Sequence, residues 1–148
     1  MERMPPLINI LIRTHRPELL KRCLNSVANC GYENKQVHAI DGTGYGENYQ
    51  YNLLCNLLKA EVTDGYFFFL DDDDILISGA LPVIADNLID YKPIICQMLR
   101  NGIAKPSLNV VLRGHIGLPC MVLHHTLKYE ADFTAMQSGD FEWISQVT

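Results

Sequence analysis

Four consecutive aspartates, at positions 71–74, directly follow a run of apolar residues at positions 66–70. Closely spaced carboxylate oxygens are the ligands that Mg²⁺, Mn²⁺ and Ca²⁺ prefer in proteins, and adjacent carboxylates repel one another unless a cation neutralises them. A solvated acidic turn has the same composition, so the run of charge does not identify a site by itself. Its position at the end of an apolar segment favours a divalent-cation or phosphate site.

The apolar segment Tyr66-Phe67-Phe68-Phe69-Leu70 has no polar alternation. This pattern indicates a strand covered on both faces, as in a parallel sheet with helices on each side. In such sheets ligands bind beyond the carboxyl ends of the strands. The aspartates follow the carboxyl end of this strand, so the sheet would present them to a ligand.

Polar residues also follow the two earlier predicted strands, at positions 7–12 and 37–40. These residues are Arg13, Thr14, His15 and Arg16 after the first strand, and Asp41 after the second. Apolar residues at helical spacing predict helices over 17–27 and about 47–60. The resulting βαβαβ order predicts an α/β fold with a mostly parallel central sheet flanked by helices.

The second half of the chain predicts further elements of the same kind. They are a helix over 81–89, a strand over 93–99, a turn at 101–102 leading to a run at 110–112, a strand over 120–123 and a helix that begins near Asp140. The turn and the run after it predict a hairpin-like addition to the sheet.

Whole-chain quantities exclude several classes of protein. The 148 residues fit one domain, and the net charge of −5 with scattered Lys and Arg argues against a nucleic-acid partner.

Five cysteines without a Cys-x-x-Cys pair argue against a disulfide framework and a zinc site, so we expect reduced thiols and a cytoplasmic protein. No apolar run reaches membrane-spanning length. A homodimer is one assembly to consider.

Three motifs together resemble those of a known family. Residues 9–27, which include Thr14-His15-Arg16-Pro17 and Leu20-Lys21-Arg22-Cys23-Leu24-Asn25-Ser26, resemble the opening of family-2 glycosyltransferases of the GT-A fold. Leu70-Asp71-Asp72-Asp73-Asp74 resembles that family's Asp-x-Asp signature. Ser138-Gly139-Asp140-Phe141-Glu142-Trp143 resembles its late Glu-Asp motif, which carries the catalytic base. The order and approximate spacing of these motifs agree with the family across nearly the whole chain. The chain is short and resembles the minimal glycosyltransferases that some viruses encode.

The resemblance implies a single GT-A (Rossmann-like) domain over residues 1–148 and a metal-dependent, inverting glycosyltransferase. The donor would be a nucleoside-diphosphate sugar, and a UDP-sugar such as UDP-glucose is favoured. The cofactor would be Mn²⁺ or Mg²⁺. The acceptor would be a hydroxyl of a glycan or protein-linked group. The implied roles are a nucleoside pocket at Thr14, His15 and Arg16, recognition of the base by Asp41, ribose or metal contacts by Asp71, a nucleotide contact by Asp72, the principal metal ligand at Asp73 and the general base at Asp140.

Two other function classes stay open. One is a non-catalytic or hydrolytic module that binds a UDP-sugar and a metal, because Arg13 stands where the family has proline and Gly139 where it has glutamate. The other is a different Mg²⁺-dependent enzyme. An aspartyl phosphatase would carry its acidic motif near the first strand, and a nucleotidyltransferase would usually carry a glycine-rich loop there; neither feature is present in this sequence.

Overall fold

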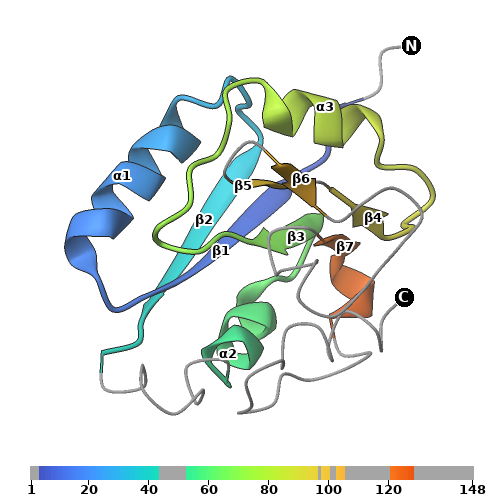
Figure 1. The fold of residues 1–148 in the computed structure, drawn as a ribbon. Helices are drawn as coiled ribbons and strands as arrows, with labels where there is room; N and C mark the ends of the chain where they lie inside the picture. Colours follow the sequence, from blue (N-terminus) through green and yellow to red (C-terminus); the bar gives the residue numbers. More distant parts are fainter. Residues whose placement is uncertain (1–3, 44–52, 97, 101–102, 106–120, 129–148) are drawn as a thin grey trace.

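The computed structural model describes residues 4–43, 53–96, 98–100, 103–105 and 121–128. The elements in chain order are β1 (Ile8–Thr14), α1 (Pro17–Ala28), β2 (Lys35–Asp41), α2 (Leu54–Glu61), β3 (Tyr66–Phe69), α3 (Ala80–Asp86), β4 (Ile94–Ile95), β5 (Met98–Arg100), β6 (Ile103–Lys105), β7 (Met121–His124) and the 3₁₀ helix η3 (His125–Leu127) (Figure 1).

The main sheet has five strands in the order β2-β1-β3-β7-β4. β1 pairs in parallel with β2 on one side and with β3 on the other. β7 is antiparallel to both β3 and β4, so it alone among these five strands runs against the others. The predicted mostly parallel sheet is therefore confirmed.

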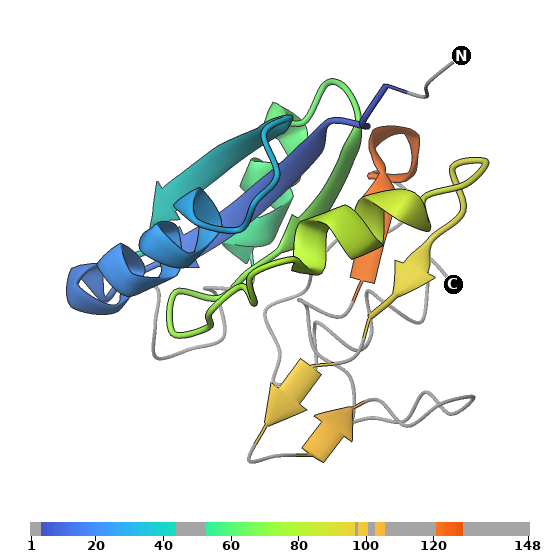
Figure 2. The same ribbon diagram turned by 90° about the horizontal axis from the view of Figure 1, so that it is seen from above.

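Helices cover both faces of the sheet. α1 and α3 lie on one side and α2 on the other, as Figure 2 shows from above. Along β3, Tyr66 and Phe68 belong to the apolar cluster under α1 and α3, whereas Phe67 and Phe69 belong to the cluster under α2. All four side chains are buried. The unbroken apolar sequence of this strand follows from its two covered faces.

The helix and strand boundaries of the first half agree closely with the sequence prediction. α1 begins with Pro17 at its first position, where a missing N–H is tolerated, and buries Cys23 and Val27. The predicted second helix is present as α2, although its expected start near position 47 lies outside the described residues. The order βαβαβ therefore holds through β3.

The second half differs from the prediction at two places. The helix predicted over 81–89 is α3, which ends at Asp86, so positions 87–89 follow it. The segment 93–99, predicted as one strand, is divided between β4 in the main sheet and β5 in a separate sheet of two strands. β5 pairs with β6, residues 103–105, in this separate sheet. The prediction of a hairpin added to the main sheet is therefore wrong. The predicted turn at 101–102, the run at 110–112 and the helix from Asp140 lie outside the described residues.

Candidate functional site

The carboxyl ends of β1, β2 and β3 meet at one edge of the sheet because these strands are parallel. Thr14 at the end of β1 is in register with Asp41 at the end of β2, and the N–H of Gly42 donates to the carbonyl of Thr14. The N–H of Leu70, just after β3, donates to the carbonyl of Leu11 at 2.9 Å. The three polar segments that the sequence placed after strands are therefore neighbours.

Residues 71–74, which we call the acidic loop, begin with a tight turn. The N–H of Asp74 donates to the carbonyl of Asp71 at 3.0 Å. One carboxylate oxygen from each of Asp71, Asp73 and Asp74 lies within 4.8 Å of the other two. Three converging carboxylates suit the oxygen-preferring cations Mg²⁺ and Mn²⁺. The sequence had named Asp73 and Asp71 as ligands and had given Asp74 no separate role.

Asp72 has a different environment from its three neighbours. Its side chain is 1% exposed, against 52% for Asp73. The hydroxyl of Thr14 donates to Oδ2 of Asp72 at 2.9 Å. The guanidinium of Arg16 donates from Nε to Oδ2 at 3.3 Å and from Nη2 to Oδ1. Asp72 therefore joins the end of β1 and the start of α1 to the acidic loop.

The charge of Asp72 is stabilised despite its burial. Burial raises the pKa of this carboxyl, but the hydrogen bonds from Arg16 and Thr14, the guanidinium charge and the backbone N–H of His15 outweigh burial and hold the pKa below its usual value. Nη2 of Arg16 also lies 3.6 Å from Oδ2 of Asp73. Arg16 thus lies between a buried carboxylate and an exposed one.

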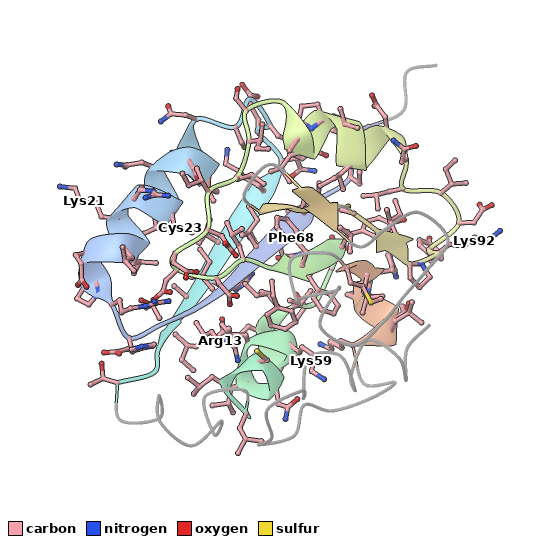
Figure 3. All side chains as sticks on the ribbon, viewed as in Figure 1. Arg13, Lys21, Cys23, Lys59, Phe68 and Lys92 are labelled. Carbon is pink, nitrogen blue, oxygen red and sulfur yellow. The ribbon has the colours of Figure 1, made fainter. Side chains whose placement is uncertain are left out.

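Arg13 contributes a second guanidinium on the other face of the sheet. Alternation along β1 places Arg13 on the same face as Leu11, which packs in the cluster under α2, and Figure 3 shows its side chain near that helix. Nε of Arg13 lies 3.6 Å from Oδ1 of Asp71. The sequence indicated Arg13 as a polar residue after the first predicted strand and as a departure from the family, without a role in the site. The available signal was its position near the carboxyl end of a predicted parallel strand, at the same edge of the sheet as the acidic run.

α1 also contacts the acidic loop and the segment that follows it. The thiol of Cys23 donates to the carbonyl of Asp71 at 3.6 Å, and the N–H of Leu76 donates to the Ser26 hydroxyl at 3.0 Å. Figure 3 labels Cys23 on α1. Burial, followed by the negative charges of the four neighbouring aspartates, raises the pKa of this thiol to about 11. Cys23 is therefore a protonated packing residue.

Two of the remaining predicted residues, Asp41 and His15, lie at this edge. Asp41 is exposed, and its Oδ1 accepts hydrogen bonds from the N–H of Thr43 at 2.9 Å and from its hydroxyl at 2.6 Å. These bonds, the hydroxyl first, lower the pKa of Asp41, so it is a carboxylate at neutral pH. His15 is exposed beside Thr14. Asp140 lies outside the described residues, so its predicted role as base stays a prediction.

Comparison with known proteins places this geometry in context. No model of a protein family and no curated protein sequence matches the chain. Among solved structures, S. aureus TarS 1-349 matches with a TM-score of 0.69 at 14% identity, over 95% of this chain and 55% of that one. A longer TarS structure matches with a TM-score of 0.75 at 14% identity, over 95% and 33% of the two chains. TarS 1-349 in complex with UDP-GlcNAc matches with a TM-score of 0.71 at 14% identity, over 95% and 53%.

The likeness shows a shared fold at low identity. The chain has a GT-A-like α/β fold that it shares with the TarS structures, as the sequence predicted. It spans about half the length of the TarS 1-349 structures and a third of the longer one. Within the described part of the chain, no helix is long and apolar enough to span a bilayer.

Proposed function

We propose that the protein is a divalent-cation-dependent glycosyltransferase that moves a sugar from a nucleoside diphosphate, with UDP favoured, to an acceptor hydroxyl. The observation that carries the proposal is the acidic loop at the carboxyl end of β3, where three carboxylates converge within 4.8 Å. The same fold in TarS has been solved with UDP and with UDP-GlcNAc. UDP-GlcNAc and UDP-glucose are therefore the first donors to test.

The residues at this edge fit the parts of such a site. Asp71, Asp73 and Asp74 would hold Mn²⁺ or Mg²⁺, which when bound stabilises negative charge on the leaving diphosphate. The exposed carboxylate of Asp41, at the end of β2 and in register with the end of β1, would supply a hydrogen-bond acceptor for a nucleobase. Asp140 is the proposed general base for the acceptor hydroxyl, by its place in the late motif.

A second candidate function is a non-catalytic or hydrolytic module that binds a UDP-sugar and a metal. It is favoured by two departures from the family's motifs, since Arg13 stands where the family has proline and Gly139 where it has glutamate. Donor recognition and acceptor recognition are separate tasks, and the contacts that support the proposal belong to the donor side. Both candidates share the cation site and differ in whether the sugar is transferred to an acceptor.

The shared part of the proposal is tested by thermal unfolding with UDP, UDP-GlcNAc and UDP-glucose, each with and without Mn²⁺. A ligand that binds the native state at one hundred times its Kd adds about 2.7 kcal/mol, which corresponds to a rise of roughly 5–10 °C for a chain of this size. We expect this rise only with Mn²⁺, because a diphosphate beside the acidic loop is otherwise repelled.

Asp73→Asn is the informative variant, and Asp90→Asn is its matched control. Asp90 is an exposed aspartate between α3 and β4 with φ of 56°, a conformation that asparagine tolerates. Asp73→Asn should remove the Mn²⁺-dependent rise, while Asp90→Asn should keep it. Tight metal-independent binding by Asp73→Asn would refute the cation site, and the absence of any rise with the unaltered protein would refute the function.

A further inference from the structure

The four aspartates of the acidic loop are equivalent in sequence but divided in the structure. Three of them, Asp71, Asp73 and Asp74, converge on one point. Asp72 instead turns into the protein and pairs with Arg16. The same guanidinium lies 3.6 Å from the carboxylate of Asp73, so it is shared by a buried partner and an exposed one.

We propose that Asp72 is a positioning residue that restrains Arg16 and thereby keeps its guanidinium from occupying the place of the cation beside Asp73. A guanidinium and a divalent cation are attracted to the same carboxylates and so compete for them. The two-point contact with Asp72 fixes the planar group in one orientation. The inference rests on the proposed function in so far as a cation binds at the acidic loop.

The hydrogen-bond donors around Asp72 favour this role over that of a cation ligand. Its two oxygens accept from the Thr14 hydroxyl, from Nε and Nη2 of Arg16 and from the backbone N–H of His15. A carboxylate has roughly four lone-pair directions, so these four donors leave little capacity for a cation. Asp73, by contrast, is about half exposed and faces the other two converging carboxylates. Asp72 is therefore committed to its donors, and Asp73 is accessible to a cation.

The contact also couples two loops that are distant in sequence. Asp72 and Arg16 are 56 residues apart, and Arg16 immediately precedes the first residue of α1. The amides of Leu19 and Leu20 donate to the carbonyl of Arg16, so its backbone is fixed by the helix. Only the long side chain of Arg16 can therefore move between Asp72 and Asp73. Removing the charge of Asp72 should release that side chain toward Asp73.

The test is a double-mutant cycle on Mn²⁺ affinity, measured by calorimetry with Asp72→Asn, Arg16→Gln and the double variant. Asparagine still accepts from Thr14 but carries no charge to hold the guanidinium. We expect Asp72→Asn to weaken Mn²⁺ binding by about tenfold, a typical coupling between contacting residues. Adding Arg16→Gln should restore affinity to within about threefold of Arg16→Gln alone. If the double variant binds Mn²⁺ as weakly as Asp72→Asn does, then Asp72 is itself a ligand of the cation and the proposal is wrong.

A metal-free measurement separates this proposal from the proposed function. The Nε–H of Arg16, assigned by its loss in Arg16→Gln, should exchange slowly with water in the unaltered protein because it is hydrogen-bonded to Asp72. Asp72→Asn should accelerate that exchange, and the control Asp90→Asn should not. Failure of the unaltered protein to bind Mn²⁺ would refute the cation site alone. An unchanged exchange rate in a folded Asp72→Asn variant would overturn the restraint of Arg16, whatever the affinity for Mn²⁺.

Discussion

The hydroxyl of Thr14 donates to the carboxylate of Asp72 across a separation of 58 residues, and both side chains are buried. This bond predicts the outcome of two substitutions at position 14. Thr14→Val keeps the shape of the side chain but leaves a buried carboxylate short of a donor, so it should lower the free energy of unfolding by about 1–3 kcal/mol. Thr14→Ser keeps the hydroxyl and loses one methyl group, and it should lower the free energy by about 1 kcal/mol or less. Urea denaturation measures both, and equal losses would contradict the role of the bond.

Gly65 and Gly31 provide a pair of substitutions that separates steric overlap from backbone strain. Both have positive φ, 73° and 80°. A Cβ on Gly65 would lie 2.3 Å from the carbonyl oxygen of Leu7, whereas a Cβ on Gly31 would have no atom within 4 Å. Gly31→Ala should therefore lower the free energy of unfolding by about 1–2 kcal/mol from conformation alone. Gly65→Ala should lower it by about 3 kcal/mol or more, because backbone must also move. Thermal unfolding distinguishes them, and similar losses would show that the contact with Leu7 is easily relieved.

The parts of the fold that the sequence predicted are those set by local pattern. The apolar run at positions 66–70 predicted a strand with both faces covered, and β3 has this environment. The apolar segment 93–99 was misread, because a short run of such residues does not show which strands will pair with it. Its first part pairs with β7 and its last part with β6. Strand partners distant in sequence depend on tertiary packing that composition does not encode locally.

The same limit applied to the candidate site. Parallel strands predicted that the polar segments after β1, β2 and β3 would be neighbours, and the register of Thr14 with Asp41 confirms this for the first two. The four aspartates could not be told apart from their sequence. What distinguishes Asp72 is burial against Thr14 and Arg16, which are 58 and 56 residues away. A contact of that separation leaves no periodic signal.

His124 predicts a loss of stability at mildly acidic pH. The residue is 7% exposed, and the centroid of its ring lies 5.0 Å from that of Tyr66 and 4.0 Å from that of Tyr91. Burial, followed by the charge of His125, lowers the pKa of His124 from 6.5, against an opposing effect of Asp64. The unfolded chain therefore binds a proton at a higher pH than the folded protein. The contribution of His124 to the free energy of unfolding is fully present above about pH 6.5. It is lost as the pH falls from there through the pKa of the folded state.

The free energy of unfolding should accordingly decrease between pH 7 and pH 5, with a slope from this residue of at most about 1.4 kcal/mol per pH unit. His124→Phe keeps an aromatic ring between its neighbours and should remove that part of the slope. His15→Gln, at an exposed position, is the control and should leave the slope in place. If His124→Phe and the unaltered protein have the same slope in urea denaturation, the buried imidazole is not its source.

Asp41 predicts a preference for uracil over cytosine. Its Oδ1 is held by Thr43, and the group is an exposed carboxylate at the end of β2. A carboxylate accepts the N3–H of uracil, whereas cytosine presents an acceptor at the matching position. UDP should therefore bind about tenfold more tightly than CDP in calorimetry, as expected for one hydrogen bond to a charged group. Asp41→Ala should narrow the difference, and Glu33→Ala, at an exposed acidic residue before β2, should preserve it. Equal affinities in the unaltered protein would show that Asp41 does not read the base.

Substitution of Asp140 should distinguish a protein that transfers the sugar from one that only binds it. If its carboxylate removes the proton of the acceptor hydroxyl, it is needed for transfer and hardly at all for donor binding. General-base catalysis typically contributes about 10²–10⁴-fold, so Asp140→Asn should lose that much turnover while UDP-sugar affinity changes by less than about threefold. Asparagine is as good a helix cap as aspartate, so a capping role would leave both turnover and stability nearly unchanged.

The assay follows UDP release with a panel of acceptors and with water as the reference acceptor. Glu142→Gln is the companion variant, because Glu142 is the next carboxylate in the same motif. Full activity in Asp140→Asn together with loss in Glu142→Gln would assign the base to Glu142. Mn²⁺-dependent binding of the UDP-sugar without UDP release under any condition would instead favour the binding module, since the cation site and the base are independent requirements for transfer.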